Sequence, residues 1–201
     1  TDYSSVYILL RSALETYLTF NYIFVSAKSN VEAKFRFNCW SLSTHTDRER
    51  FIADSEEAIQ FMANDAIEMV KLKSIIESSE IYQQLSKAEQ KAILKGNWRM
   101  QKSWVDLACI AGYSRKNIGM QYSYLSGHAH ANKSSIHHIK ANRNLNDRAG
   151  NFNLSYSVML SVLCKFNYDF IYLIPELHHF RDGNDVGFQI ISKWKNIIAL
   201  L

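Results

Sequence analysis

In the stretch MQYSYLSGHAHANKSS, residues 120–135, a tyrosine, a serine and a histidine follow one another at intervals of four residues. Side chains four residues apart share one face of an α-helix, so Tyr122, Ser126 and His130 would form a polar stripe. Arg115 precedes this stripe by two helical turns and falls near it. Two hydroxyls and an imidazole in line can bind a small polar ligand or pass a proton, because histidine titrates near neutral pH. Alternatively, Ser126 lets two helices approach closely and His130 makes one structural hydrogen bond.

A second polar pair lies on the first predicted helix. Arg11 and Glu15 are four residues apart, at positions next to apolar ones. A partly buried arginine or carboxylate is costly unless it is paired. We interpret Arg11 as a charged donor at a ligand site that Glu15 orients. The alternatives are a surface pair worth about a few tenths of a kcal/mol, or a buried pair that fixes packing.

The stretches RSALETYLTFNYIF and AGYSRKNIGMQYSYLSGHAHA resemble an uncharacterised family of bacterial all-helical proteins, domain of unknown function five-six-seven-seven. That family combines Arg-x-x-x-Glu on an early helix with Tyr-x-x-Leu-Ser-x-x-x-His on a later one. The matching residues are Arg11 and Glu15, then Tyr122, Leu125, Ser126 and His130. The resemblance covers roughly residues 7–135. It implies a helical fold and a shared polar site, and it brings no established activity.

A more distant likeness is to the helical nucleotide-binding domains of toxin and phage-defence systems. Many of those are metal-independent ribonucleases with an Arg-x(4–6)-His motif, and no arginine here has a histidine at that spacing. The departure leaves open a site assembled in space, with Arg11 and His130 on different helices.

The functional hypothesis is therefore a metal-independent, RNA-acting domain of a defence or toxin type. His130, Arg11 and Glu15 are the candidate catalytic residues, with His130 acting on a ribose hydroxyl and Arg11 stabilising the phosphate charge. Candidate substrate-binding residues are Tyr122, Ser126 and Arg115. The alternatives are a non-catalytic regulatory or ligand- and partner-binding module, or a buried network that only holds helices together.

Metal and cofactor sites are not expected. The seven histidines include three close pairs, yet no HExxH or Cys-His spacing accompanies them. Adjacent histidines on a helix diverge by about 100°, so a doublet supplies one ligand at most. Glycine-rich phosphate loops and the G-x-S-x-G elbow are absent from the sequence as well.

The partners that the charge permits include RNA or another nucleic acid. The net charge is +4, which allows an anionic partner without requiring one. A basic stretch at 132–148 could contact phosphates through Lys133, Lys140, Arg143 and Arg148. It lacks interleaved aromatic residues, which favours a solvated loop. The last helix, FQIISKWKNIIALL, has an apolar side that suits either the core or a homodimer or other protein interface.

The three cysteines are far apart and lie in apolar runs, which indicates free thiols and a cytoplasmic location. No signal peptide is recognisable, and the start without methionine is compatible with a piece of a longer protein. The most apolar segment, 154–174, contains Lys165, Asn167 and Asp169, so we expect a core helix and no membrane contact.

The chain has one proline and seven glycines in 201 residues, and so few breakers favour long helices. We predict an all-α protein, a bundle of about seven helices in a single domain over 1–201. The expected helical segments are 3–28, 30–42, 46–76, 87–96, 103–112, 115–131, 154–177 with a kink at Pro175, and 188–201. In the first segment apolar residues recur at helical spacing: Tyr7, Leu10, Leu14, Tyr17 and Leu18. Ser29 or Asn30 is the expected N-cap of the second segment, Thr46 or Asp47 opens the third, and Ser86 with Glu89 forms a capping box for the fourth.

Overall fold

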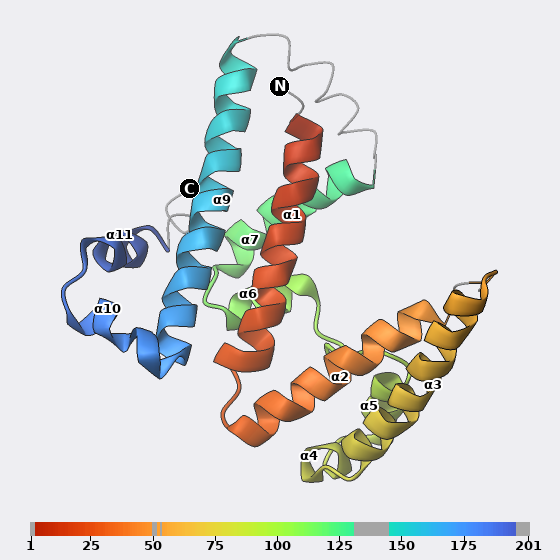
Figure 1. The fold of residues 1–201 in the computed structure, drawn as a ribbon. Helices are drawn as coiled ribbons and strands as arrows, with labels where there is room; N and C mark the ends of the chain where they lie inside the picture. Colours follow the sequence, from red (N-terminus) through yellow and green to blue (C-terminus); the bar gives the residue numbers. More distant parts are fainter. Residues whose placement is uncertain (1–2, 50–51, 53, 131–144, 196–201) are drawn as a thin grey trace. The chain divides into compact units, whose positions relative to one another are not determined.

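The computed structural model describes residues 3–49, 52, 54–130 and 145–195, and the regular structure in them is entirely helical (Figure 1). The all-α prediction is confirmed for this part of the chain. The α-helices are α1 (Tyr3–Phe20), α2 (Asn30–Arg48), α3 (Glu56–Glu77), α4 (Glu80–Gln83), α5 (Lys87–Leu94), α6 (Trp104–Ile110), α7 (Arg115–Ala129), α9 (Leu145–Leu173), α10 (His178–Asp182) and α11 (Val186–Trp194).

The expected number of about seven helices was low, since the described residues contain ten α-helices. The helices that the sequence did not reveal are α4 and α10, of 4 and 5 residues. Helices this short have no apolar period to recognise.

The chain divides into two compact units. Unit 1 comprises Thr1–Ser26 and Trp104–Leu201, and unit 2 is the segment Ala27–Ser103 between them. The single domain expected for residues 1–201 stays a prediction, because this division describes contacts and not the cooperativity of unfolding.

Unit 1 is built around α1, which packs against α7 and α9 (Figure 1). The buried residues of α1 recur at helical spacing, as the sequence predicted: Tyr7, Leu10, Leu14, Tyr17 and Leu18. The partner helices also bury apolar side chains, Ile118 and Leu125 on α7 and Val158 and Val162 on α9. Helices α10 and α11 pack against α9.

A polar network ties the end of α1 to α9. Tyr17 donates a hydrogen bond to Asp169 Oδ2 at 2.8 Å, and Asn21 Nδ2 donates to the same oxygen at 2.9 Å. The predicted single helix over 3–28 changes at Asn21 into a π-helical turn, Asn21–Val25, which contains this buried amide. π-helical turns are rare interruptions of α-helices. This one begins at Asn21, the residue whose side-chain amide is buried.

Lys165 is a buried cation beside this network. Its Nζ lies 4.9 Å from the centre of the Tyr113 ring, a cation–π contact, and its side chain is almost fully buried. Burial lowers the pKa of Lys165, although Asp169 opposes that effect.

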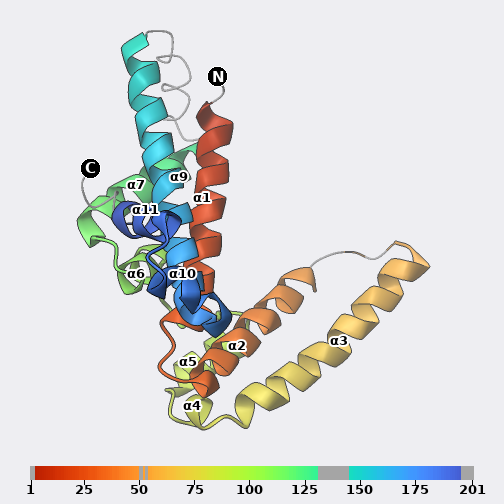
Figure 2. The same ribbon diagram turned by 60° about the vertical axis from the view of Figure 1, so that its left-hand side comes forward.

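Unit 2 is a helical hairpin of α2 and α3 completed by α4 and α5 (Figure 2). Its core consists of Phe35, Cys39, Leu42, Met69, Ile76, Tyr82 and Ile93. Two predicted caps are confirmed: Ser29 accepts from the backbone of Glu32, and Ser86 with Glu89 forms a capping box. Gly96 closes this region with φ of +90°, where a side chain would be strained.

Some predicted boundaries were wrong. Thr46 does not begin a helix: it lies inside α2 and bonds back to the carbonyl of Leu42, while Ser55 caps α3. The helix expected over 154–177 begins at Leu145 and ends at Leu173, so the kink predicted at Pro175 is instead a break, followed by the short 3₁₀ helix Pro175–Leu177. In the described residues the last helix ends at Trp194, and residues 196–201 lie outside them.

The three cysteines are free thiols, as predicted, with Cys39 and Cys164 buried. Burial raises the pKa of Cys39 to about 12. Within the described part of the chain, no single helix is long and apolar enough to cross a membrane. The bent pair Ala149–Leu173 and Pro175–Asp182, with 110° between its halves, meets that test as a pair by length and composition.

The core position of α1 gives a matched stability test. Leu14 is 0% exposed and Leu9 of the same helix is 69% exposed. Leu14→Ala should lower the free energy of unfolding by about 2–5 kcal/mol, because it removes buried apolar surface and leaves a cavity. Leu9→Ala should change it by less than about 0.5 kcal/mol. Urea unfolding followed by circular dichroism measures both, and equal effects would contradict this packing of α1.

Lys165 gives a pH-dependent test. Because its pKa is lower in the folded protein than in the unfolded chain, the unfolded chain binds more protons, and the contribution of Lys165 to stability improves as pH rises. Lys165→Met should therefore be as stable as the parent or more stable at pH 7, and this advantage should shrink towards pH 9.5. Urea unfolding of both proteins across that range measures the difference. A difference that stays constant or grows with pH would show that Lys165 is not destabilised by burial.

Candidate functional site

Helices α1 and α7 bring the predicted polar residues together in unit 1. Arg11 lies one turn after the buried Tyr7 and three residues before the buried Leu14, on the edge of the packed face of α1. Ser114 precedes α7 as its N-cap residue, and Ile118 and Leu125 pack α7 into the core. This packing places Tyr122 next to α1, and it places His130 at the C-cap of α7.

The four groups form one hydrogen-bonded cluster, which we call the Arg11 cluster: Arg11, Glu15, Tyr122 and His130. Arg11 Nε donates to Glu15 Oε1 at 2.9 Å, and the Tyr122 hydroxyl donates to the same oxygen at 2.6 Å. Arg11 Nη2 lies 3.4 Å from the Tyr122 hydroxyl, and Arg11 Nη1 lies 3.3 Å from His130 Nε2. The two motifs, more than 100 residues apart in sequence, thus meet in space.

The electrostatics of the cluster keep Arg11 charged and Tyr122 protonated. Burial alone would lower the pKa of Arg11, but hydrogen bonding to Glu15 and the proximity of Tyr122 raise it overall. The pKa of Tyr122 is raised by burial and by the neighbouring Glu15 carboxylate. Tyr122 is therefore a hydrogen-bond donor at neutral pH and not a base.

The contact of His130 with Arg11 defines its tautomer. A guanidinium has only donors, so His130 Nε2 must accept, and the proton of the neutral ring must be on Nδ1. A protonated imidazole would have no acceptor for Arg11 and would place two positive charges side by side. His130 is exposed and Arg11 is mostly buried, so the histidine forms the solvent side of the cluster.

Two predicted site residues lie apart from these bonds. Arg115 is exposed and forms an ion pair with Asp106 of α6, about 10 Å along α7 from Tyr122 at 1.5 Å per residue. Ser126 lies on the same face of α7 as Tyr122, but its buried Oγ has no hydrogen-bond partner in the part of the chain that the structure describes. The structure therefore brings together four of the six candidate residues.

His128, two residues before His130 on α7, faces a different environment. It is buried, its Nδ1 lies 3.2 Å from the Ser4 hydroxyl, and its ring packs against Tyr7 and Tyr124. These contacts give it a structural role between α1 and α7.

The adjacent histidines of the described C-terminal region contact the backbone. His178 and His179 contact the backbone carbonyl oxygens of Tyr172 and Glu176. Among the described residues, no group of three or more His, Cys, Asp or Glu side chains could hold a metal ion. His137, His138 and the basic residues Lys133, Lys140 and Arg143 lie outside the described residues, and so does the side chain of Arg148.

Unit 2 contains a second polar group that the sequence did not reveal, formed by His45 and Arg48 of α2 and Asp65 of α3. The only sequence signal is the i, i+3 spacing of His45 and Arg48, which puts them on one side of α2. Asp65 could not be matched to them because the boundary between α2 and α3 was predicted wrongly.

Comparison of the chain with protein-family models, with curated proteins and with solved structures gives no match. The resemblance based on the two motifs therefore stays a prediction. The functional argument depends on the geometry of the Arg11 cluster.

The cluster predicts a specific pattern of stabilities. Arg11→Met leaves the Glu15 carboxylate without its cation and should lower the free energy of unfolding by about 1–3 kcal/mol. Adding Glu15→Leu should restore the stability to within about 1 kcal/mol of the parent, because no unpaired charge remains. Chemical unfolding of Arg11→Met, of Glu15→Leu and of the double variant measures the coupling free energy between the two side chains.

The exposed pair Glu68 and Lys71 on α3 is the matched control. Its coupling should be below about 0.5 kcal/mol, since water screens both charges. Equal coupling in the two pairs would mean that Arg11 and Glu15 behave as surface charges.

Proposed function

We propose that the Arg11 cluster is an RNA-acting site of a metal-independent ribonuclease type. The observation that supports this proposal is the 3.3 Å contact between Arg11 Nη1 and His130 Nε2. It pairs a fixed positive charge with an imidazole nitrogen that acts as an acceptor. These are the two groups that a transfer at a phosphodiester needs: one stabilises charge and the other moves a proton.

Substrate binding would change the partner of Arg11. A phosphate oxygen is a stronger acceptor for a guanidinium than a neutral imidazole is, so it would replace His130 at Nη1. His130 Nε2 would then be free to accept a proton. Glu15 and Tyr122 would hold Arg11 in place during this exchange through Nε and Nη2.

The reaction would be an internal transfer at phosphorus. His130 Nε2 takes the proton of the ribose 2′ hydroxyl while O2′ forms a bond to phosphorus and the P–O5′ bond breaks. The O5′ leaving group takes a proton from water, and the product carries a 2′,3′-cyclic phosphate. Arg11 stabilises the negative charge that accumulates on the phosphate oxygens.

The residues assigned here keep the predicted roles with two exceptions, Tyr122, which positions Arg11 and was expected to bind substrate, and Arg115. His130 acts as base, Arg11 binds phosphate, Glu15 and Tyr122 position Arg11, and Ser126 is a candidate for substrate contact. We assign no role in the reaction to Arg115, because its side chain pairs with Asp106. The bacterial origin, the defence or toxin context and the cytoplasmic location belong to the same proposal and rest on the sequence motifs and the free cysteines.

A non-catalytic binding module is the second candidate. The observation that favours it is that Arg11, Glu15 and Tyr122 satisfy one another without any bound molecule. Such a cluster could recognise a small ligand or a protein partner through the exposed His130. RNA would then remain intact.

An RNA-cleavage assay with EDTA present tests the proposal. The purified chain should cleave a labelled RNA oligonucleotide, and His130→Ala should lower the rate at least about 100-fold, the usual contribution of a general base. The matched control is His179→Ala, an exposed histidine of the same unit that contacts the backbone carbonyl of Glu176 and the ring of Phe180 and takes no part in the Arg11 cluster.

Loss of cleavage in His130→Ala with retention in His179→Ala would support the ribonuclease. Uncut RNA with the parent chain, whose fold is verified by circular dichroism, would overturn it in favour of the binding module.

A further inference from the structure

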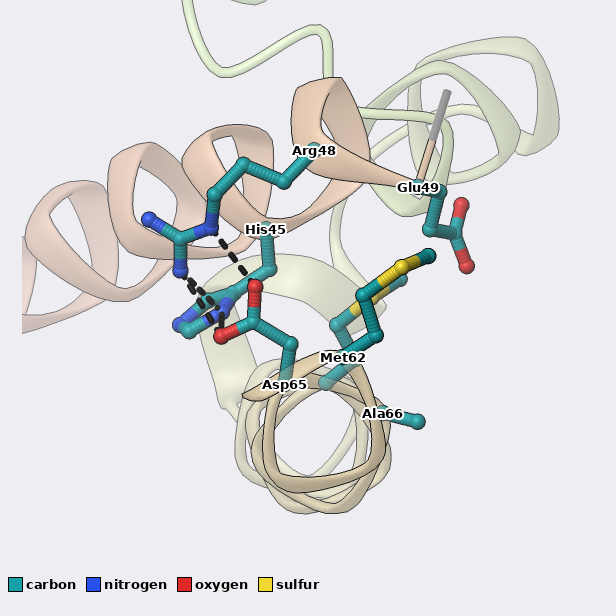
Figure 3. A pocket seen from close by; sticks show the side chains of 7 residues that line it. His45, Arg48, Glu49, Met62, Asp65 and Ala66 are labelled. Atoms are coloured by element: carbon teal, nitrogen blue, oxygen red, sulfur yellow. Dashed lines mark hydrogen bonds and ion pairs between the residues drawn. The ribbon is translucent and has the colours of Figure 1, made fainter. Parts of the chain in front are cut away.

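Unit 2 contains a cavity of about 370 Å³ between α2 and α3 (Figure 3). His45, Arg48 and Glu49 come from the C-terminal end of α2, and Met62, Asp65 and Met69 come from α3. A volume of this size lies within the range of small-molecule sites. The cavity is separate from the Arg11 cluster, so it concerns a property beyond the proposed function.

One wall is an ion pair with an attached histidine. Arg48 binds Asp65 through two parallel hydrogen bonds, from Nε at 2.6 Å and from Nη2 at 2.8 Å. This pairing raises the pKa of Arg48 and lowers that of Asp65, so both stay charged. Because the guanidinium is already matched to a carboxylate, Arg48 is poorly suited to bind an anion.

His45 completes this wall beside the ion pair. Its Nδ1 lies 2.9 Å from both Asp65 Oδ1 and Arg48 Nη2. Nδ1 donates to the Asp65 carboxylate when it carries the ring proton and accepts from the Arg48 guanidinium when it does not. In either tautomer the histidine is held against the ion pair.

The charge of the lining is negative overall. Arg48 and Asp65 cancel, and Glu49 contributes one further negative charge at the rim. In Figure 3 the carboxylate of Glu49 and the side chain of Met62 lie on one side of Asp65, and Arg48 and His45 lie on the other. A ligand on the Glu49 side of the cavity would therefore meet an anionic rim next to an apolar side chain.

The remaining part of the cavity lining is apolar and consists of Met62, Ala66 and Met69. Methionine thioethers are flexible and make favourable contacts with aromatic rings. This surface suits an apolar body, and an aromatic one in particular.

We propose that the cavity binds a small organic cation with an aromatic body, of the arylalkylamine class. The ring packs against Met62 and Met69, and the ammonium group lies at the rim, where the Glu49 carboxylate supplies the charge and accepts its hydrogen bonds. Arg48 and Asp65 also join α2 to α3, which fixes the wall before a ligand arrives.

Titration calorimetry of the full chain tests this inference with three probes of similar shape. 2-Phenylethylamine should bind, while the uncharged 2-phenylethanol and the anionic 3-phenylpropionate should bind at least about fivefold more weakly. Glu49→Gln should weaken the amine about three- to tenfold, which corresponds to the loss of one partly screened charge contact. The control is Glu68→Gln, an exposed carboxylate of α3 that does not line the cavity and should leave binding unchanged.

Filling the cavity gives an independent check. Ala66 is on the exposed side of α3, so Ala66→Phe should fold normally and abolish binding. Three outcomes would overturn the proposal: no binding of the amine at millimolar concentration, equal or tighter binding of the anion, or equal effects of Glu49→Gln and Glu68→Gln.

Discussion

Desolvation of Arg11 is the constraint on which the arrangement of unit 1 depends. The aromatic and leucine face of α1 packs against α7 and α9, and this packing removes the neighbouring guanidinium from most of the solvent. A charge in that position is tolerated only because Glu15 and Tyr122 surround it with matched hydrogen bonds. The same packing that stabilises the helices therefore also orients the group that is proposed to meet a phosphate.

Two tyrosine hydroxyls in the core of unit 1 likewise depend on matched hydrogen bonds. Tyr7 and Tyr17 are both buried, and each donates to a polar residue of α9, Asn151 and Asp169 respectively. A buried hydroxyl that loses its partner costs more than the bond contributes, so these contacts select one alignment of α1 on α9. Leucines at the same positions would fill the space without that selectivity.

The sequence predicted those structural features that depend on residues close together along the chain. The period of Tyr7, Leu10, Leu14, Tyr17 and Leu18 identified the buried face of α1, and the Ser86–Glu89 box identified the start of α5. The prediction of a helix start at Thr46 was wrong, because a threonine can donate a hydrogen bond to a carbonyl of its own helix as readily as it can cap a new helix. Tertiary packing decides between the two.

The candidate sites show the same limit. Helical phase grouped Arg11 with Glu15 and Tyr122 with His130, but their meeting depends on how α1 packs against α7, which no short motif specifies. The phase argument placed Arg115 near the stripe, and a nearer carboxylate on α6 holds its side chain elsewhere. The sequence did not reveal the group of His45, Arg48 and Asp65, because its members come from two helices and the boundary between these helices was predicted wrongly.

The order of the two units along the chain has a consequence for synthesis. Unit 1 is discontinuous, with α1 at the start and its partners α7 and α9 after the whole of unit 2. During translation α1 leaves the ribosome long before those partners exist, whereas all of unit 2 is available once residue 103 has emerged. Folding that proceeds from the N-terminus cannot apply to unit 1. The apolar face of α1 can be covered in part once α7 has been made, and completely only after α9 follows.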